Sequence, residues 1–244
     1  MPDQRAYHKW NSERLGREME ILVFGDRGAR VLVFPTRDGR FFDFENWGMV
    51  GALADKINHG YIQLICVDSN DRNSLYADWM DPADRMRQHE AYEAYILHEV
   101  LPFSEILNPG SFLIAHGCSL GGFHAVNIAF RHPALFGKVV ALSGRYDLTV
   151  STGSFRDLFD GHNDDRIYYN NPSYYVPNIE DPLLLEQLRR MEIILAIGDE
   201  DAFCRNNREF SEVLTEKGIP HALHVWDGEA HRPRYWRQMV KLYL

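Results

Sequence analysis

Short apolar runs alternate with longer amphipathic segments along this chain of 244 residues. Runs such as ILVF, VLVFP and IILAI are uninterrupted, which is typical of strands buried on both faces of a sheet. The runs predict strands at residues 19–24, 30–35, 62–68, 111–116, 138–143, 193–197 and 221–226.

The longer segments repeat their apolar positions every three or four residues, most clearly in AYEAYILHEVLPFSEIL. This period predicts helices at residues 46–58, 84–105, 120–131, 206–217 and 234–243. Strands that alternate with helices indicate an α/β fold, with a mostly parallel twisted sheet flanked by helices on both faces. We expect strand 19–24 to pair antiparallel with strand 30–35 through the turn at 25–28, forming an edge of this sheet.

One segment, residues 146–181, interrupts the alternation. It is rich in Asp, Asn, Tyr, Ser and Pro, and it is long for a connection between two elements. It is either a surface insertion whose tyrosines pack on the sheet or a lid-like partial cover of an active site. In the second case Tyr168 and Tyr169 are candidate substrate contacts, and residues 68–79, which follow a central strand, are a candidate wall of the same cleft.

Composition narrows the class of protein. With 45% hydrophobic and 13% aromatic residues, the chain can bury one large core, so we expect a single domain over residues 1–244. The net charge of −9 argues against a nucleic-acid-binding protein. The cysteines at 66, 118 and 204 have neither disulfide-framework nor zinc-site spacing. A polar start and the lack of a membrane-length apolar run lead us to expect a cytoplasmic protein without metal or cofactor.

The stretch AHGCSLGGFHA, residues 115–125, contains the pattern G-x-S-x-G between a predicted strand and a predicted helix. The pattern alone arises by chance in roughly one chain in twenty of this length, so its context decides. A serine held on a sharp strand-to-helix turn, with close-packed glycines on both sides, is the nucleophile of many hydrolases. We therefore predict that Ser119 is a nucleophile.

A serine nucleophile needs a base and an orienting acid, and both candidates follow late strands. His231 lies in a glycine-containing loop after the last predicted strand, and is the candidate base. Asp201 comes three residues after Gly198 at the end of the preceding strand, and is the first candidate for the acid. Asp199 and Asp147 remain alternatives for the acid.

The oxyanion of the reaction needs backbone donors. Leu120 begins the helix after Ser119, so its N–H is one candidate. The turn PTRDG, residues 35–39, follows an early strand and is the candidate for the second donor. We expect the N–H of Arg37 in that role, with Asp38 next, unless the segment is only a tight polar turn.

Four stretches together resemble the Putative esterase family of α/β-hydrolases, over nearly the whole chain from residue 31. That family includes S-formylglutathione hydrolases, feruloyl esterases, siderophore esterases and mycolyltransferases. The stretches are VFPT.DG, GCSLGGFHA..IAFRHP.LFGKVVALSG.YDL, AIGDEDAF and W.GEAH.

The resemblance implies an α/β-hydrolase fold and a triad of Ser119, Asp201 and His231. It also carries over Leu120 and the turn at 36–38 as oxyanion donors. The implied function is a serine hydrolase that cleaves small-molecule carboxylic esters through an acyl-enzyme. Acyl transfer on the same scaffold and a non-catalytic binding protein are the alternatives.

The sequence departs from the family pattern just after the histidine. The family commonly has a small acidic or hydroxyl residue and then a tryptophan there, and this chain has Arg232 and Pro233. Arg232 and Arg234 are either possible contacts to an anionic substrate group or solvated arginines on the last helix.

Overall fold

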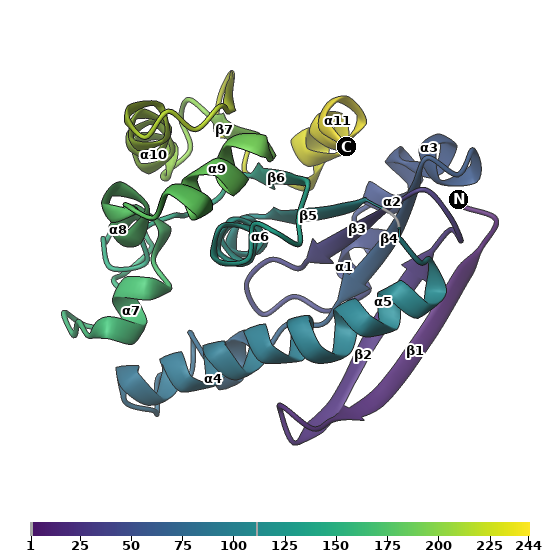
Figure 1. The fold of residues 1–244 in the computed structure, drawn as a ribbon, viewed down its shortest axis with the longest axis horizontal. Coiled ribbons are helices and arrows are strands. Elements are labelled where there is room, and N and C mark those ends of the chain that lie inside the picture. The colour runs from purple at the N-terminus through teal and green to yellow at the C-terminus, as the bar shows by residue number, and fades with distance from the viewer. Residues whose placement is uncertain (1, 111) are drawn as a thin grey trace.

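The predicted α/β architecture is present. The protein is described by a computed structural model over residues 2–110 and 112–244, so the first residue of the predicted strand 111–116 lies outside the described part. Within that part, one eight-stranded sheet has the order β1-β2-β4-β3-β5-β6-β7-β8 (Figure 1). The strands are β1 (Arg5–Ser12), β2 (Arg17–Phe24), β3 (Ala29–Phe34), β4 (Ile62–Val67), β5 (Leu113–Cys118), β6 (Lys138–Leu142), β7 (Glu192–Gly198) and β8 (Ala222–Trp226).

The six strands from β3 to β8 are parallel, and β1 and β2 run antiparallel at one side of the sheet. The predicted pairing of strand 19–24 with strand 30–35 is wrong. One edge of β2 is taken by the hairpin with β1, in which Ile21 faces His8. The other edge pairs with β4, in which Ile21 faces Val67, so β4 separates β2 from β3.

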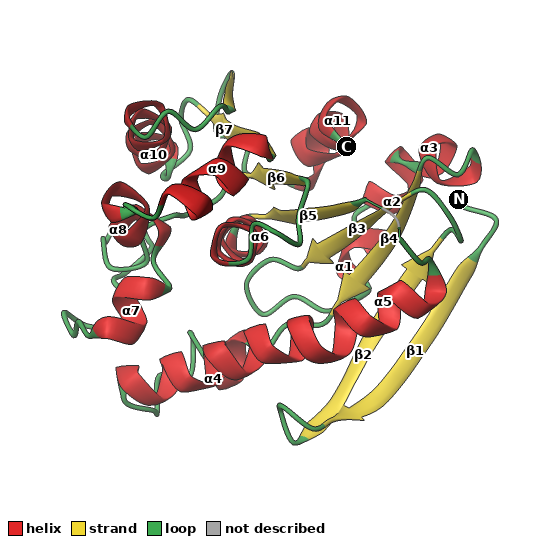
Figure 2. Ribbon diagram, in the orientation of Figure 1, coloured by secondary structure: helices red, strands yellow, loops and turns green. Residues whose placement is uncertain are grey.

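Helices cover both faces of the sheet (Figure 2). One face carries α1, α2, α3 and α11, and the other carries α4, α5, α6, α8, α9 and α10. Alternate residues of β2 enter the two cores, Ile21 on the α4 side and Leu22 on the α11 side. The helices are α1 (Asp43–Asn46), α2 (Met49–Ala52), α3 (Ala54–Asn58), α4 (Pro82–Tyr95), α5 (Leu101–Leu107), α6 (Leu120–Arg131), α7 (Asp165–Tyr169), α8 (Pro172–Tyr175), α9 (Pro182–Arg190), α10 (Cys204–Glu216) and α11 (Pro233–Tyr243).

Two predicted helices differ in detail from the observed ones. The predicted helix 46–58 is broken into α1, α2 and α3, because Gly48 adopts a left-handed φ of 72° that ends the first helical turn. The predicted helix 84–105 is α4 and α5 joined by a π-helical segment, Ile96–Val100. Helices α7, α8 and α9 were not predicted.

The segment 146–181 folds as two different parts. Its second half contains α7 and α8, and Tyr175, Val176 and Ile179 belong to the buried core on the α4 side of the sheet. Its first half contains Phe155, which is partly buried against Phe203 at the carboxyl edge of the sheet. The second half is therefore a structural layer, and the first half is the part that reaches the strand ends.

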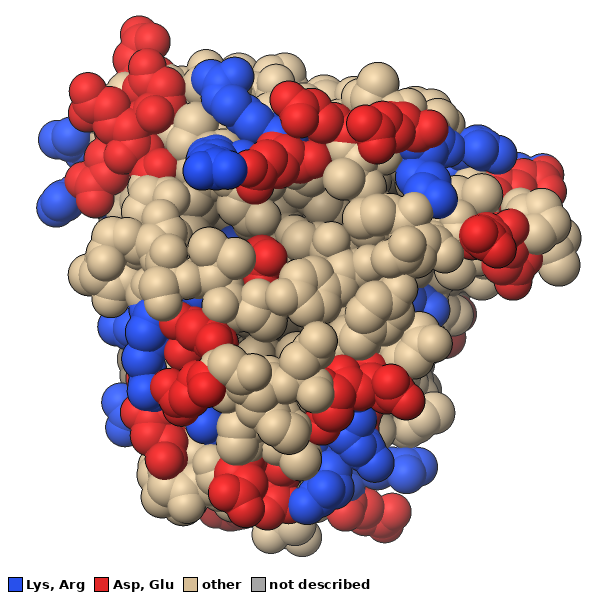
Figure 3. All heavy atoms as spheres, turned by 90° about the vertical axis from the view of Figure 1, so that its left-hand side faces the viewer, with Lys and Arg blue, Asp and Glu red and all other residues tan. Residues whose placement is uncertain are grey.

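No helix in residues 2–110 or 112–244 combines the length and the apolar character needed to cross a bilayer. On the face drawn in Figure 3, acidic and basic side chains are interspersed. This face has no continuous basic surface of the kind that binds nucleic-acid phosphates.

Strand β5 and helix α6 meet in a turn in which backbone packs against backbone. A Cβ atom on Gly117 would lie 2.1 Å from the carbonyl oxygen of Gly121. A Cβ atom on Gly121 would lie 2.4 Å from the carbonyl oxygen of Phe34. Because close-packed atoms do not approach to these distances, a side chain at either glycine would force β5, α6 and the end of β3 apart.

Gly121→Ala should therefore destabilise the protein. We expect the free energy of unfolding to fall by about 1–3 kcal/mol, because the added methyl group overpacks a backbone contact. Gly51→Ala on α2 is the matched control, since a Cβ there meets nothing within 4 Å; it should change stability by no more than about 1 kcal/mol. Urea unfolding of both variants measures the difference, and equal effects would contradict the packing argument.

A buried histidine on β5 makes the free energy of unfolding depend on pH. His116 donates its Nδ1 hydrogen to the carbonyl oxygen of Val140, 2.8 Å away, and burial lowers the pKa of His116 from 6.5 to about 4. The unfolded chain therefore binds a proton more readily than the folded chain between these values. We expect the free energy of unfolding to fall as the pH drops through this window, by up to about 1.4 kcal/mol per pH unit from this ring.

Urea unfolding between about pH 7 and pH 5.5 measures this slope. His116→Gln, which cannot titrate, should show a shallower slope than the unmodified protein. An identical slope in the two proteins would assign the acid sensitivity to other groups.

Candidate active site

Ser119 stands at the turn between β5 and α6 in a strained backbone conformation. Its φ is 57° and its ψ is −122°, a combination that costs of order 1–3 kcal/mol for a residue with a side chain. Its N–H donates to the carbonyl oxygen of Leu142 on β6, at 2.8 Å. The flanking glycines and this hydrogen bond hold the serine in a conformation that exposes its hydroxyl at the carboxyl ends of the parallel strands.

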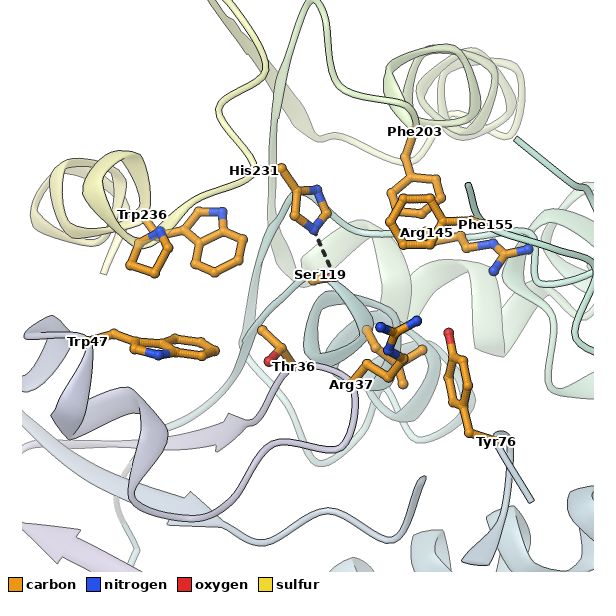
Figure 4. Close-up of a pocket in the computed structure, with 12 residues that line it drawn as sticks. Thr36, Arg37, Trp47, Tyr76, Ser119, Arg145, Phe155, Phe203, His231 and Trp236 are labelled. Carbon is orange, nitrogen blue, oxygen red and sulfur yellow. Dashed lines mark hydrogen bonds between the residues drawn. The ribbon is translucent and has the colours of Figure 1, made fainter. Parts of the chain in front are cut away.

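His231 approaches this hydroxyl from the loop between β8 and α11 (Figure 4). Its Nε2 lies 2.9 Å from Oγ of Ser119, and its Nδ1 lies 2.8 Å from Oδ2 of Asp201. A carboxylate on Nδ1 favours the tautomer that carries its hydrogen there, so Nε2 is left to accept the hydrogen of the serine hydroxyl. Residues that are 112 positions apart in the chain are thus joined by hydrogen bonds.

Asp201 is the acidic candidate that contacts this histidine. Its side chain is 1% exposed, and its other oxygen, Oδ1, accepts the N–H of Phe203 at 3.0 Å. The backbone donor fixes the carboxylate while its second oxygen faces His231.

The other two acidic candidates make different contacts. Oδ1 of Asp199 accepts the N–H of Gly228 at 2.7 Å, which ties the loop after β8 to the end of β7. Oδ1 of Asp147 accepts hydrogens from Thr149 and Asn171. Neither contact involves the histidine, and both fix local loop structure.

The turn after β3 lies beside the serine, as the sequence predicted. Arg37 and Leu120 both line the cavity next to Ser119. The N–H of Leu120 lies in the first turn of α6, where backbone donors have no partner within the helix. The N–H of Asp38 instead donates to Oδ2 of Asp71 at 3.0 Å, so this alternative donor is engaged elsewhere.

The carboxylate of Asp71 contacts both this turn and helix α6. Its side chain is 1% exposed, and its Oδ1 lies 3.1 Å from Nε2 of the buried His124 on α6. Through Asp71, the turn that holds Arg37 and the helix that starts at Leu120 are linked by side-chain hydrogen bonds as well as by packing. Sequence reasoning missed this pair, because Asp71 lies in a loop and His124 lies a full turn beyond the serine.

A cavity of about 460 Å³ lies over the serine, at the carboxyl ends of the parallel strands. Sequence reasoning anticipated the walls near 35–39 and 68–79 and a cover from residues 146–181, which contributes Phe155, but it missed Trp47 and Arg145. Arg145 had one available signal, its position just after a parallel strand, where ligand sites collect. The lining residues are Thr36, Arg37, Trp47, Tyr76, Ser119, Leu120, Arg145, Phe155, Phe203, His231, Pro233 and Trp236.

Four candidate substrate contacts do not line this cavity. Tyr168 packs on the α4-side core, and Tyr169 is 58% exposed. Arg232 is exposed and pairs with Glu229, and the guanidinium of Arg234 lies over the neighbouring Tyr235 ring.

The described residues contain no group of three or more His, Cys, Asp and Glu side chains arranged to hold a metal ion. Next to the serine, burial raises the pKa of the Cys118 thiol. In this site, the hydroxyl of Ser119 is hydrogen-bonded to the imidazole of His231.

Comparison with solved structures identifies the fold that carries this site. Among solved structures, a ferulic acid esterase matches with a TM-score of 0.77 at 19% identity, covering 99% of this chain and 96% of the other. A fluorophosphonate-binding serine hydrolase F of Staphylococcus aureus matches with a TM-score of 0.75 at 17% identity, covering 99% and 97%. The S-formylglutathione hydrolase of the same organism gives 0.73 at 16% identity, covering 98% and 97%.

At these identities the structural matches establish the fold, which is the α/β-hydrolase fold that the sequence predicted. No curated protein sequence matches the chain at a significant level. The family model described as "Putative esterase" matches residues 12–241, nearly the whole length. The chain therefore belongs to the Putative esterase family, and it is a carboxylic-ester hydrolase.

Proposed function

We propose that this protein hydrolyses small-molecule carboxylic esters through a Ser119–His231–Asp201 triad and an acyl-enzyme. The observation that carries the proposal is the pair of hydrogen bonds on His231, 2.9 Å to the serine hydroxyl and 2.8 Å to the carboxylate. These distances are within reach for proton transfer before any substrate binds. The expected cytoplasmic location and single-domain organisation stay predictions.

In the first half-reaction, Nε2 of His231 takes the proton of Ser119 as the serine oxygen attacks the ester carbonyl carbon. The carbonyl oxygen becomes an oxyanion, and the N–H groups of Leu120 and Arg37 donate to it. Asp201 stabilises the imidazolium that has formed. His231 then gives its proton to the alcohol oxygen, the carbon–oxygen bond of the ester breaks, and the alcohol leaves.

In the second half-reaction, water replaces the alcohol. His231 removes a proton from the water as its oxygen attacks the acyl-enzyme carbonyl, and the same donors hold the second oxyanion. Collapse of this intermediate breaks the bond to Ser119, which recovers its proton from His231. Each oxyanion donor should lower the barrier by about 2.7–4 kcal/mol.

Ser119→Ala should abolish turnover without unfolding the protein. We expect kcat for 4-nitrophenyl acetate to fall by about 10⁴-fold or more, because no nucleophile remains. A fluorophosphonate probe should label the unmodified protein and leave Ser119→Ala unlabelled. Ser154→Ala, which removes an exposed hydroxyl, is the matched control and should label normally. Undiminished ester hydrolysis by Ser119→Ala would refute the mechanism.

Asp201→Asn should show which aspartate is the acid of the triad. An amide on Nδ1 no longer holds the imidazole in the required tautomer, so we expect kcat to fall by about 10⁴-fold. Asp199→Asn is the control, because its amide oxygen can still accept the N–H of Gly228; we expect less than about a tenfold loss. A larger loss in Asp199→Asn than in Asp201→Asn would reassign the acid.

A further inference from the structure

The cavity above Ser119 has two unlike ends (Figure 4). Trp47 and Trp236 lie on one side of the serine, with ring centroids 5.9 Å apart. Arg37, Tyr76 and Arg145 lie on the other side, together with the rings of Phe155 and Phe203. We call Arg37, Tyr76 and Arg145 the basic end of the cavity. An ester whose carbonyl sits at Ser119 would have one side against indole rings and the other side against two guanidinium groups and two phenyl rings.

Neither arginine at the basic end forms an ion pair within the described residues, although the carboxylate of Asp38 acts on Arg37 through charge. The twelve lining residues include two arginines and no aspartate or glutamate. In the described part of the chain, no carboxylate lies within ion-pair distance of Arg37 or Arg145. The guanidinium carbon of Arg37 instead lies 5.3 Å from the ring centroid of Tyr76. Burial raises the pKa of Tyr76, so the phenol is neutral and able to donate a hydrogen bond.

Arg145 is the stronger indication, because it is a buried cation. The residue is 3% exposed. Its Nε donates to the carbonyl oxygen of Asp147, and its Nη2 donates to those of Leu148, Val150 and Arg156, at 2.7–3.2 Å. These carbonyls satisfy hydrogen-bond donors but carry no net charge. A buried charge is normally paired with an opposite one, and no described carboxylate lies within ion-pair distance of this guanidinium.

The nearby acids offset part of the charge of Arg145 but do not contact its guanidinium. Asp147 and Asp157 act on Arg145 through charge, but their carboxylate oxygens accept hydrogens from other groups. The carboxylate of Asp147 is engaged by Thr149 and Asn171. The carboxylate of Asp157 accepts the N–H groups of two residues in its own loop. The Nη1 nitrogen of Arg145 has no carbonyl or carboxylate acceptor in the described chain.

We propose that the basic end is a subsite for a carboxylate of the substrate, held by Arg37, Arg145 and the hydroxyl of Tyr76. The natural ester then carries a negative charge on one side of the scissile bond and an apolar group on the other. Guanidinium groups suit this role because their planar fork matches the two oxygens of a carboxylate. The inference deepens the proposed function and rests on it, since it places the charge relative to the reacting serine.

Two pairs of esters test the charge and the side on which it lies. The 4-nitrophenyl monoester of adipic acid is compared with its terminal amide, which puts the charge on the acyl side. Sodium 4-acetoxybenzoate is compared with 4-acetoxybenzamide, which puts the charge on the leaving group. We expect kcat/KM of the anionic member of one pair to exceed that of its neutral partner by roughly 10- to 100-fold, the usual range for a hydrogen bond to a charged group.

Arg37→Gln is the variant to test. Arg145→Gln is less suitable, because it would lose the hydrogen bonds that Arg145 donates to four backbone carbonyls and can fail to fold. Arg37→Gln should reduce the ratio of anionic to neutral kcat/KM by about tenfold, and Tyr76→Phe should reduce it less. Arg232→Gln is the matched control, since it removes the same charge from the site margin but outside the cavity wall; the ratio should not change. Added salt should also lower the ratio in the unmodified protein.

The outcomes separate this inference from the proposed function. Hydrolysis of both members of each pair at equal kcat/KM would overturn the carboxylate subsite and leave the triad intact. A preference that survives Arg37→Gln, or that falls equally in Arg232→Gln, would also overturn it. Failure to hydrolyse all four esters, together with no fluorophosphonate labelling, would instead refute the proposed function.

Discussion

The whole site depends on one close contact between backbones, at the turn where β5 leads into α6. Gly117 and Gly121 let the strand, the helix and the end of β3 approach to distances at which a side chain does not fit. This contact forces Ser119 into its left-handed conformation and brings the first N–H of α6 beside the turn after β3. The nucleophile and both candidate oxyanion donors are therefore positioned by the same packing.

A second contact of the same kind aligns the base with the acid. A Cβ atom on Gly198 would lie 2.2 Å from the carbonyl oxygen of Gly228, so the end of β7 and the loop after β8 touch directly. Asp199 strengthens the contact by accepting the N–H of Gly228. Asp201 follows Gly198 and His231 follows Gly228, each by three residues, so their side chains meet above the contact.

The sequence predicted the inner strands well, because a strand buried on both faces is an uninterrupted apolar run. It missed β1, whose residues RAYHKWNS are mostly exposed at the sheet edge. It also mispaired β2, because its partner β4 is 40 to 46 residues away in the chain and leaves no local signal. The candidate triad was predictable because Ser119, Asp201 and His231 each follow a strand. Trp47 was not, because its place in the cavity depends on how a non-repetitive segment folds back, and Arg145 had only its position just after β6 as a signal.

Arg145 links the fold of the insertion to the chemistry of the cavity. Its guanidinium donates hydrogen bonds to four backbone carbonyl oxygens within residues 147–156. The loop held in this way places Phe155 at the cavity wall. The carbonyl dipoles make burial of the cation tolerable, but they leave its net charge in place. The insertion therefore folds around this buried cation and contributes Phe155 to the site, and its tyrosine-rich half packs in the core.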